Sequence, residues 1–295
     1  MQSEPLAAPE LSPRQLCFIV ADVPKTVAFC EEHFGWGPFM QFKAPVANAS
    51  YRGWSGEKLT EVALGMAGGG QIEFLRVHFG HDTTMDYQSA YGTGLQHIGI
   101  RAASRDSALE HLTSLGASVN ELNEYPGIRF AFVDVPTGPG MFEILEPLKE
   151  KAASNFDATV KRKSEDRDQL KIDRATIVTR NIDKALSFYG RAFSWGESRA
   201  TDSVLACNDK EFNFRRFLKK HGRIELEFLE PDAKDDTPYS HHLNNVENGL
   251  IHASGLSQSQ PPLSEAMQGE WTDTGERFSL YDWAGGKASL QIRRS

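Results

Sequence analysis

The sequence lacks long apolar runs, paired cysteines and an excess of basic residues. No run of about 18 apolar residues occurs, so no segment is predicted to span a membrane. The N-terminal segment, MQSEPLAAPELSP, has acids and prolines where a signal peptide needs a basic start and an apolar core. The three cysteines, Cys17, Cys30 and Cys207, are odd in number and lie among apolar residues, which argues against a disulfide framework or a paired zinc knuckle. We therefore expect a cytoplasmic protein with reduced thiols.

Charge and length further limit the possible partners and the number of domains. The 40 acidic residues outnumber the 32 basic ones and give a net charge of −8. This balance disfavours nucleic acid as a partner, because a phosphate-binding surface is normally basic. The 295 residues, 40% hydrophobic and 24% charged, suit two globular domains of about 100–150 residues each. We expect a small-molecule substrate, no nucleic-acid or membrane partner, and either a monomer or a homodimer.

The sequence repeats itself. GLQHIGIR (94–101) returns as GLIHASGL (249–256), and each segment is strand-like with a histidine in its fourth position. Residues 14–36 and 171–195 share a second pattern, in which a strand and a turn are followed by apolar residues at helical spacing. Each such unit ends in a closing strand, for example PGMFEILEP at 139–147. The pattern predicts a strand, a helix and about three further strands, four times over.

One unit of this kind cannot bury the apolar face of its own sheet, so the units are expected to pair. The predicted fold is α+β, with four βαβββ modules paired into two domains that have cupped mixed sheets. The charged, aromatic-poor stretch between the second and third modules is typical of a linker. We expect a flexible N-terminus at 1–11, a first domain at 12–148, a linker at 149–170 and a second domain at 171–295.

Alternation along the strands identifies a candidate site. Side chains of a strand alternate between its two faces, and each strand here has one apolar face suited to pack under its helix. The opposite face carries Gln15, Glu73, His97 and Glu143, at matching positions of the first and closing strands. Alone, each would be an ordinary packed or solvated residue. Together they predict one concave metal site, because two carboxylates that face each other are costly without a cation.

These residues, together with the segments GLQHIGI, FEILEP and GWGPF, resemble the vicinal oxygen chelate superfamily. Its members include lactoylglutathione lyase, methylmalonyl-CoA epimerase, extradiol dioxygenases and bleomycin-resistance proteins. The resemblance covers nearly the whole chain and implies cupped sheets that hold a divalent metal on their first and last strands. By position, the implied ligands are Gln15, Glu73, His97 and Glu143. The implied cofactor is one ion of Zn, Ni, Co, Mn or Fe, in the first domain only.

The second half departs from this pattern. The equivalent positions are Arg174, Glu227, His252 and Ser289. Arg174 brings a fixed positive charge to the place of the cation, so we expect it to pair with Glu227 in place of a metal. This second site is therefore predicted to be degenerate, with His252 a relic.

The resemblance implies a metal-dependent isomerase, epimerase or lyase of the glyoxalase type, which shuttles a proton next to a metal-polarised carbonyl of a small molecule. Glu143 is the first candidate for the base, and Glu73 would serve on the opposite face. The expected substrate contacts are Phe39, Phe42, Tyr51, Trp54 and Arg101.

Two other function classes stay open. One is an extradiol-type ring-cleaving dioxygenase, although such an enzyme needs two histidines and one carboxylate on iron, and only His97 occupies an implied ligand position in the first half. The other is a non-catalytic small-molecule-binding protein, like the drug-sequestering members, which needs no metal. Metal content separates the binder from both enzymes.

Overall fold

The computed structural model describes residues 9–68, 70–125, 127–136, 138–148, 170–245, 249–257, 261–283 and 286–294. Of the predicted N-terminal segment (1–11) and the predicted linker (149–170), only residues 9–11 and Leu170 fall among these. The rest of both predictions lies outside the described residues.

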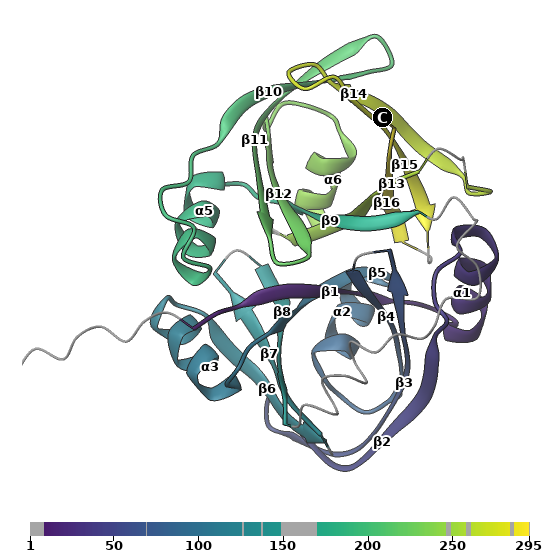
Figure 1. The fold of residues 1–295 in the computed structure, drawn as a ribbon, viewed down its shortest axis with the longest axis vertical. Coiled ribbons are helices and arrows are strands. Elements are labelled where there is room, and N and C mark those ends of the chain that lie inside the picture. Colours follow the sequence, from purple (N-terminus) through teal and green to yellow (C-terminus); the bar gives the residue numbers. More distant parts are fainter. Residues whose placement is uncertain are drawn as a thin grey trace, which may run out of the picture.

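The first half of the chain forms one eight-stranded sheet (Figure 1). Its elements are β1 (Ser12–Ile19), α1 (Val23–Phe29), the π-helical turn η1 (Cys30–Phe34), β2 (Met40–Tyr51), β3 (Trp54–Ala67), β4 (Gly70–Phe79), α2 (Thr83–Tyr91), β5 (Gly94–Arg101), α3 (Arg105–Ser114), β6 (Ser118–Tyr125), β7 (Ile128–Val135) and β8 (Gly138–Pro147). The strand order is β2-β3-β4-β1-β5-β8-β7-β6. Strand β1 runs parallel to β4 and antiparallel to β5, which in turn runs parallel to β8. Two four-stranded modules are thus joined along β1 and β5.

The second half repeats this order and closes into a barrel. Its elements are β9 (Lys171–Val178), α5 (Ile182–Ala192), β10 (Thr201–Cys207), β11 (Lys210–His221), β12 (Ile224–Pro231), α6 (Pro238–Asn245), β13 (Gly249–Leu256), β14 (Glu265–Trp271), β15 (Glu276–Trp283) and β16 (Gly286–Arg294). The closing pair is β10 with β14, where Leu205 faces Trp271. The α+β prediction is confirmed, and the second sheet curls further than the cup expected from the sequence.

The predicted helix is wrong for the fourth module. Strand β13 is followed by residues 261–264, which are not helical, and then directly by β14. Pro261 and Pro262 explain the difference, because consecutive prolines remove backbone donors and clash inside a helix. Two connecting helices, α2 and α6, were not predicted, and each joins the closing strand of one module to the first strand of the next.

The equivalent helices of the two halves begin in the same way. The side chain of Asp22 accepts a hydrogen bond from the backbone N–H of Lys25 at the start of α1. Asn181 does the same for Lys184 at the start of α5. Both are preferred N-cap residues, because their side chains satisfy one of the free donors of the first turn. The repeated sequence units therefore also share the same type of helix N-cap.

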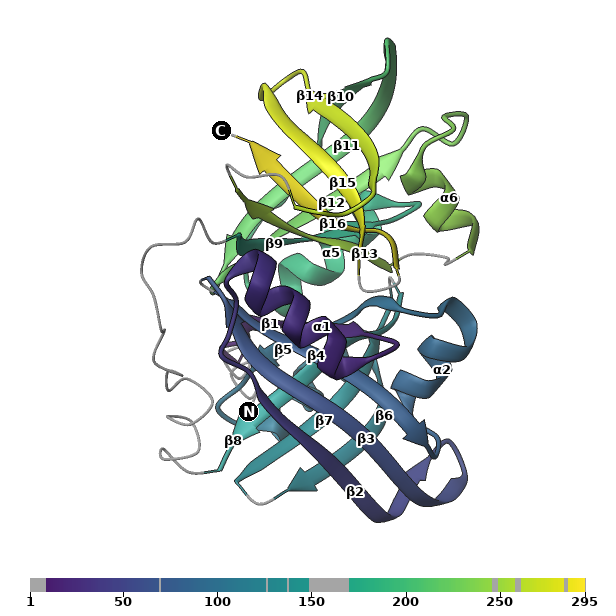
Figure 2. The ribbon, with the colours of Figure 1, turned by 90° about the vertical axis from the view of Figure 1, so that its right-hand side faces the viewer.

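The two halves pack through the apolar faces of their sheets (Figure 2). The indole of Trp283, on β15, lies 4.7 Å from the ring of Phe18 and 5.7 Å from that of Phe74. On β8, Phe142 lies 5.5 Å from the ring of Tyr189 on α5. The apolar face expected to pack under a helix thus also packs against the other half, since an eight-stranded sheet has more apolar surface than its helices cover.

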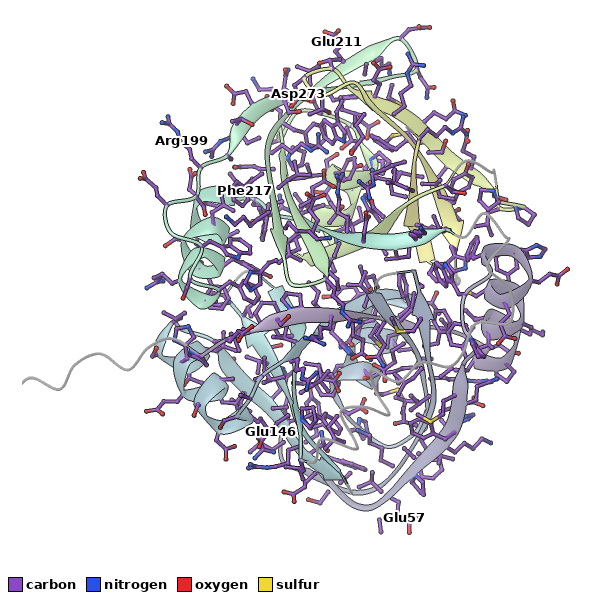
Figure 3. The ribbon with its side chains drawn as sticks, in the orientation of Figure 1. Glu57, Glu146, Arg199, Glu211, Phe217 and Asp273 are labelled. Atoms are coloured by element: carbon purple, nitrogen blue, oxygen red, sulfur yellow. The ribbon has the colours of Figure 1, made fainter. Side chains whose placement is uncertain are left out.

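Side chains fill the interiors of both halves, and Glu57 and Glu211 mark the far ends of the molecule (Figure 3). The polar face of the first sheet is left to line its own concave side. Within the described residues, every helix is too short or too polar to cross a membrane.

Candidate metal centre

Strand register brings the predicted ligands together. Cys17, on β1, has Glu73 on β4 and His97 on β5 as its Cα partners. Side chains directly opposite one another on neighbouring strands share a face. These three residues therefore form a row across the inner face of the first sheet.

Gln15 and Glu143 occupy the next row. Both have Gly99, on β5, as a Cα partner, Gln15 from β1 and Glu143 from β8. A Cβ atom at position 99 would lie 2.4 Å from Gln15 Oε1, so only a glycine lets this side chain lie across β5. All four predicted ligands thus share one face of the sheet.

Two of these side chains, Glu73 and Glu143, converge on His97. Its Nε2 lies 3.3 Å from Glu143 Oε2 and 3.5 Å from Glu73 Oε2, and its side chain has no exposed surface. Metal bonds to nitrogen and oxygen are about 2.1 Å long, so two ligands of a tetrahedral ion are separated by roughly 3.4 Å. The observed separations match that value.

Unpaired polar atoms also favour a cation. Gln15 Oε1, Glu73 Oε2 and His97 Nε2 are buried and have no hydrogen-bond partner. The other ring nitrogen, His97 Nδ1, contacts Gln96 Oε1, which orients the ring and leaves Nε2 facing the carboxylates. These donors fit a divalent metal ion, because buried polar groups are normally paired.

Protonation shows how the site balances its charge without a metal. Burial lowers the pKa of His97, but the carboxylates of Glu143 and Glu73 beside its Nε2 outweigh this effect and raise this pKa to about 9. Burial raises the pKa of Glu143, which His97 partly opposes. The metal-free site therefore retains a proton, and a divalent cation would compete with that proton.

Of the predicted substrate contacts, Phe42 is placed by register on the inner face. Phe42 pairs with Val62, and Val62 pairs with Leu75, two residues beyond Glu73 on β4. The ring is 41% exposed, although it is apolar, so it is available to a ligand.

Phe39 lies on the opposite face, whereas Tyr51 and Trp54 lie where β2 ends and β3 begins. Phe39 stacks on Phe74 at 5.4 Å, on the face that packs against the second half. Tyr51 is buried and donates to Asp86, and Trp54 lies edge-on to His81 at 5.2 Å. Phe39 precedes β2 in irregular chain, so alternation along the strand does not define its face. Arg101 follows His97 on β5 at the same parity and is partly exposed.

Sequence reasoning missed two aromatic residues of this face. Phe132, on β7, is the Cα partner of Glu143, and its ring lies 5.2 Å edge-on from that of His97. Phe130 contacts Phe132 at 6.0 Å. The alternation in RFAFVDV at 129–135 was a signal for both.

A buried lysine at the rim was also missed. Lys58 Nζ, from β3, lies 2.6 Å from Asp82 Oδ2 and 3.0 Å from Glu121 Oε1 on β6. This group joins opposite walls of the concave sheet. Its partners are far apart in the sequence, so no local pattern could have indicated it.

In the second half, arginine occupies the equivalent place. Glu227 is completely buried, and its Oε1 lies 2.7 Å from Arg216 and 3.6 Å from Arg174. Burial raises the pKa of Glu227, but Arg216 and Arg174 outweigh it and lower this pKa to about 2. Burial lowers the pKa of His252 to about 3, so this imidazole is neutral. The side chain of Ser289 lies outside the described residues.

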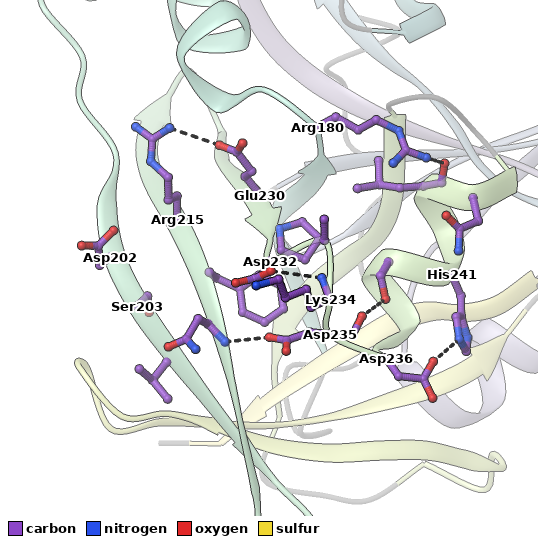
Figure 4. Close-up of a pocket in the computed structure, with 18 of the residues that line it drawn as sticks. Arg180, Asp202, Ser203, Arg215, Glu230, Asp232, Lys234, Asp235, Asp236 and His241 are labelled. Atoms are coloured by element: carbon purple, nitrogen blue, oxygen red, sulfur yellow. Dashed lines mark hydrogen bonds and ion pairs between the residues drawn. The ribbon is translucent and has the colours of Figure 1, made fainter.

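A hollow of about 960 Å³ on the second half lies between β10, β11, the end of β12 and α6 (Figure 4). Arg215, in its lining, pairs with Glu230 at 3.2 Å and with the neighbouring Asp183 at 2.7 Å. Asp235 accepts from the backbone of Asn213. By contrast, Cys17, Glu73 and His97 are grouped as metal ligands would be. Among the described residues, theirs are the acidic, thiol and imidazole ligand atoms that all lie within 4.8 Å of one another.

Known proteins share this architecture. Residues 14–132 match the Glyoxalase/Bleomycin resistance protein/Dioxygenase superfamily. These residues belong to that superfamily. A triple mutant of 4-hydroxymandelate synthase from Streptomyces coelicolor is similar over 97% of this chain and 92% of its own, with a TM-score of 0.59 and 11% identity. The Mn(II)-bound glyoxalase from Novosphingobium aromaticivorans is similar over 98% of this chain and 83% of its own, with a TM-score of 0.51 and 15% identity. No curated protein matches the sequence.

The glyoxalase-like fold therefore extends over both halves, although the superfamily match itself ends within β7. Gln15, Cys17, Glu73 and His97 lie inside the matched residues. Glu143 lies beyond them and joins the group through the pairing of β8 with β5. The family resemblance seen in the sequence is confirmed, while at these identities the solved structures show the fold alone.

Proposed function

We propose that this protein is a divalent-metal-dependent enzyme of the glyoxalase type, an isomerase, epimerase or lyase that moves a proton next to a carbonyl group of a small molecule. The observation that carries the proposal is the convergence of Glu73 and Glu143 on the buried, unpaired Nε2 of His97. Gln15 lies on the same face and completes the ligand set that the family resemblance implies.

The ion would be Zn, Ni, Co, Mn or Fe, held by the first half only. When bound, it supplies a Lewis acid that polarises the substrate carbonyl. The similar glyoxalase from Novosphingobium aromaticivorans is described as Mn(II)-bound, which makes Mn²⁺ a sensible first metal to test.

The protein's own residues supply the proton transfer. Glu143 is the candidate base, because its burial raises its pKa toward neutrality, where a carboxylate both accepts and returns protons efficiently. Glu73 approaches His97 from the other side, on β4, and would serve the opposite face of the substrate. Phe132 and Phe42 line the two walls and would exclude water from the reacting carbon.

The second half would not hold a metal. Arg216 and Arg174 already neutralise Glu227, so a further cation there would meet two fixed positive charges. We propose that this domain supports the first through their shared core. A cytoplasmic location and a monomeric or homodimeric state stay predictions.

The test is metal content by elemental mass spectrometry together with solvent-deuterium incorporation next to the carbonyl of 2-oxo and 2-hydroxy compounds. We expect about one ion per chain, lost in His97→Ala with Glu143→Ala and retained in the matched control His252→Ala. No metal in the wild type after incubation with each of the five ions would refute the proposal and favour the small-molecule binder.

A ring-cleaving or oxidising dioxygenase is the second candidate, because the tandem fold is similar to 4-hydroxymandelate synthase over nearly the whole chain. The presence of only His97 among the proposed ligands counts against it. Oxygen uptake by the Fe²⁺-loaded protein with a catechol or an aromatic 2-oxo acid would decide in its favour.

A further inference from the structure

Cys17 lies closer to the proposed ligands than its apolar surroundings in the sequence suggest. Its side chain is fully buried, and its Sγ, a carboxylate oxygen of Glu73 and a ring nitrogen of His97 all lie within 4.8 Å of one another. Glu73 and His97 are also its Cα partners on the two neighbouring strands. His97 Nε2, which is buried and has no hydrogen-bond partner, lies 3.5 Å from Glu73 Oε2.

Gln15, the ligand implied by family position, lies one row away. Its Cα partners are Gln71 on β4 and Gly99 on β5, rather than Glu73 and His97. Its amide oxygen lies across Gly99, on the side of Glu143. Gln15 is therefore placed to reach an ion from the Glu143 side only.

The second half shows the same division of roles. Thr176 occupies the position equivalent to Cys17, between Glu227 and His252 in the register. Its hydroxyl donates to Glu227 Oε2 at 2.7 Å. Arg174, equivalent to Gln15, donates to Glu225, its Cα partner, at 2.8 Å and lies farther from Glu227, at 3.6 Å. In the second half, the second inward residue of the first strand is thus hydrogen-bonded to the buried glutamate, and Cys17 has the same register position beside Glu73 in the first half.

We propose that Cys17 Sγ, rather than Gln15 Oε1, is the β1 ligand of the metal and gives the site its preference for soft ions such as Zn²⁺ or Co²⁺ over Mn²⁺. This inference rests on the proposed metal site in the first half. On binding, the S–H bond breaks, the sulfur–metal bond forms and the proton leaves to solvent. A thiolate favours borderline and soft ions, whereas a set of oxygen donors and one imidazole also accepts Mn²⁺.

A thiolate ligand would also explain how Glu143 becomes available as a base. Cys17, Glu73 and His97 supply three protein ligands, which is the usual number in a catalytic site that keeps an open position. Glu143 then has no need to remain a ligand and can accept a proton from the substrate.

The experiment is titration of metal-free protein with Co²⁺, followed by absorption spectroscopy. A thiolate ligand produces a charge-transfer band in the near ultraviolet, in addition to the visible bands of bound Co²⁺. We expect both in the wild type and in Gln15→Ala, Cys30→Ser and Cys207→Ser. Cys30 and Cys207 are buried thiols outside this group and serve as matched controls. Cys17→Ser and Cys17→Ala should keep the visible bands and lose the near-ultraviolet band.

Competition between Zn²⁺ and Mn²⁺ provides a second readout. Cys17→Ser should lower Zn²⁺ affinity by about tenfold or more, with a smaller change for Mn²⁺. Equal losses for both ions would assign Cys17 a packing role and overturn the inference. Visible bands without a near-ultraviolet band in the wild type would overturn it too, while leaving the metal site intact. Failure to bind Co²⁺ would overturn this inference, whereas only failure to bind any of the five ions would refute the proposed function as well.

Discussion

The buried lysine at the rim of the first sheet gives a quantitative prediction. Lys58 is paired with Asp82 and Glu121, and the three side chains are only 9%, 2% and 4% exposed. Asp82 also caps α2 by accepting a hydrogen bond from the backbone of Met85 at 2.7 Å. One ammonium group therefore holds β3, β6 and the start of α2 together.

Replacing Lys58 with methionine removes the cation and leaves two buried carboxylates close together. Breaking a buried ion pair in this way costs about 3–5 kcal/mol, because the remaining charge is desolvated without compensation. The melting temperature should fall by roughly 10 °C. The triple variant Lys58→Met, Asp82→Asn, Glu121→Gln should recover most of this loss, since it buries no unpaired charge.

The loss should also depend on pH. Burial raises the pKa of Glu121, and Lys58 opposes that shift. Without Lys58 this pKa rises further, so the folded variant takes up a proton more readily than the unfolded chain, and its deficit shrinks as the pH falls. Thermal unfolding from about pH 8 to pH 5 measures this, with the exposed Lys43→Met as the control. A deficit below about 1 kcal/mol, the usual value for an exposed pair, would refute the reasoning.

Three further predictions concern His97, Glu227 and Trp283. The pKa of His97 is raised to about 9, so the proton on this imidazole stabilises the metal-free fold below about pH 6.5. This contribution is lost as the pH rises through 9. His97→Gln should remove this pH dependence of the melting temperature. The pKa of Glu227, lowered to about 2, gives stability that is present above about pH 4.5 and is lost as the pH falls through 2. The stability deficit of Glu227→Gln relative to the wild type, measured by thermal unfolding, should therefore be larger at neutral pH than at about pH 2. Trp283→Ala should cost about 3–5 kcal/mol and separate the unfolding of the two halves in calorimetry.

The sequence predicts the repeated modules and the shared face of the four ligands because both depend on short-range periodicity. Gln15, Glu73, His97 and Glu143 lie on one face, as alternation within each strand requires. Alternation does not specify how far neighbouring strands slide past each other. That register, and not the family position, places Cys17 between Glu73 and His97.

Features that depend on distant contacts could not be predicted. Lys58 finds Glu121 only after the sheet curls. Phe39 follows an irregular segment whose course is set by packing against Phe74, so its face could not be read from alternation. The closing pair of β10 and β14 likewise depends on the curl of the whole second sheet.

The two halves supply the positive charge beside their buried glutamates in different ways. Each has a buried glutamate on the closing strand of a module, Glu73 or Glu227, beside a buried histidine. In the second half, Arg216 and Arg174 neutralise the glutamate permanently, and His252 stays neutral. In the first half, the positive charge comes from the proton on His97, which is exchangeable. Since a buried carboxylate requires a positive charge, we propose that the first half, whose glutamate is paired with His97 rather than with arginine, is the one that accepts a metal.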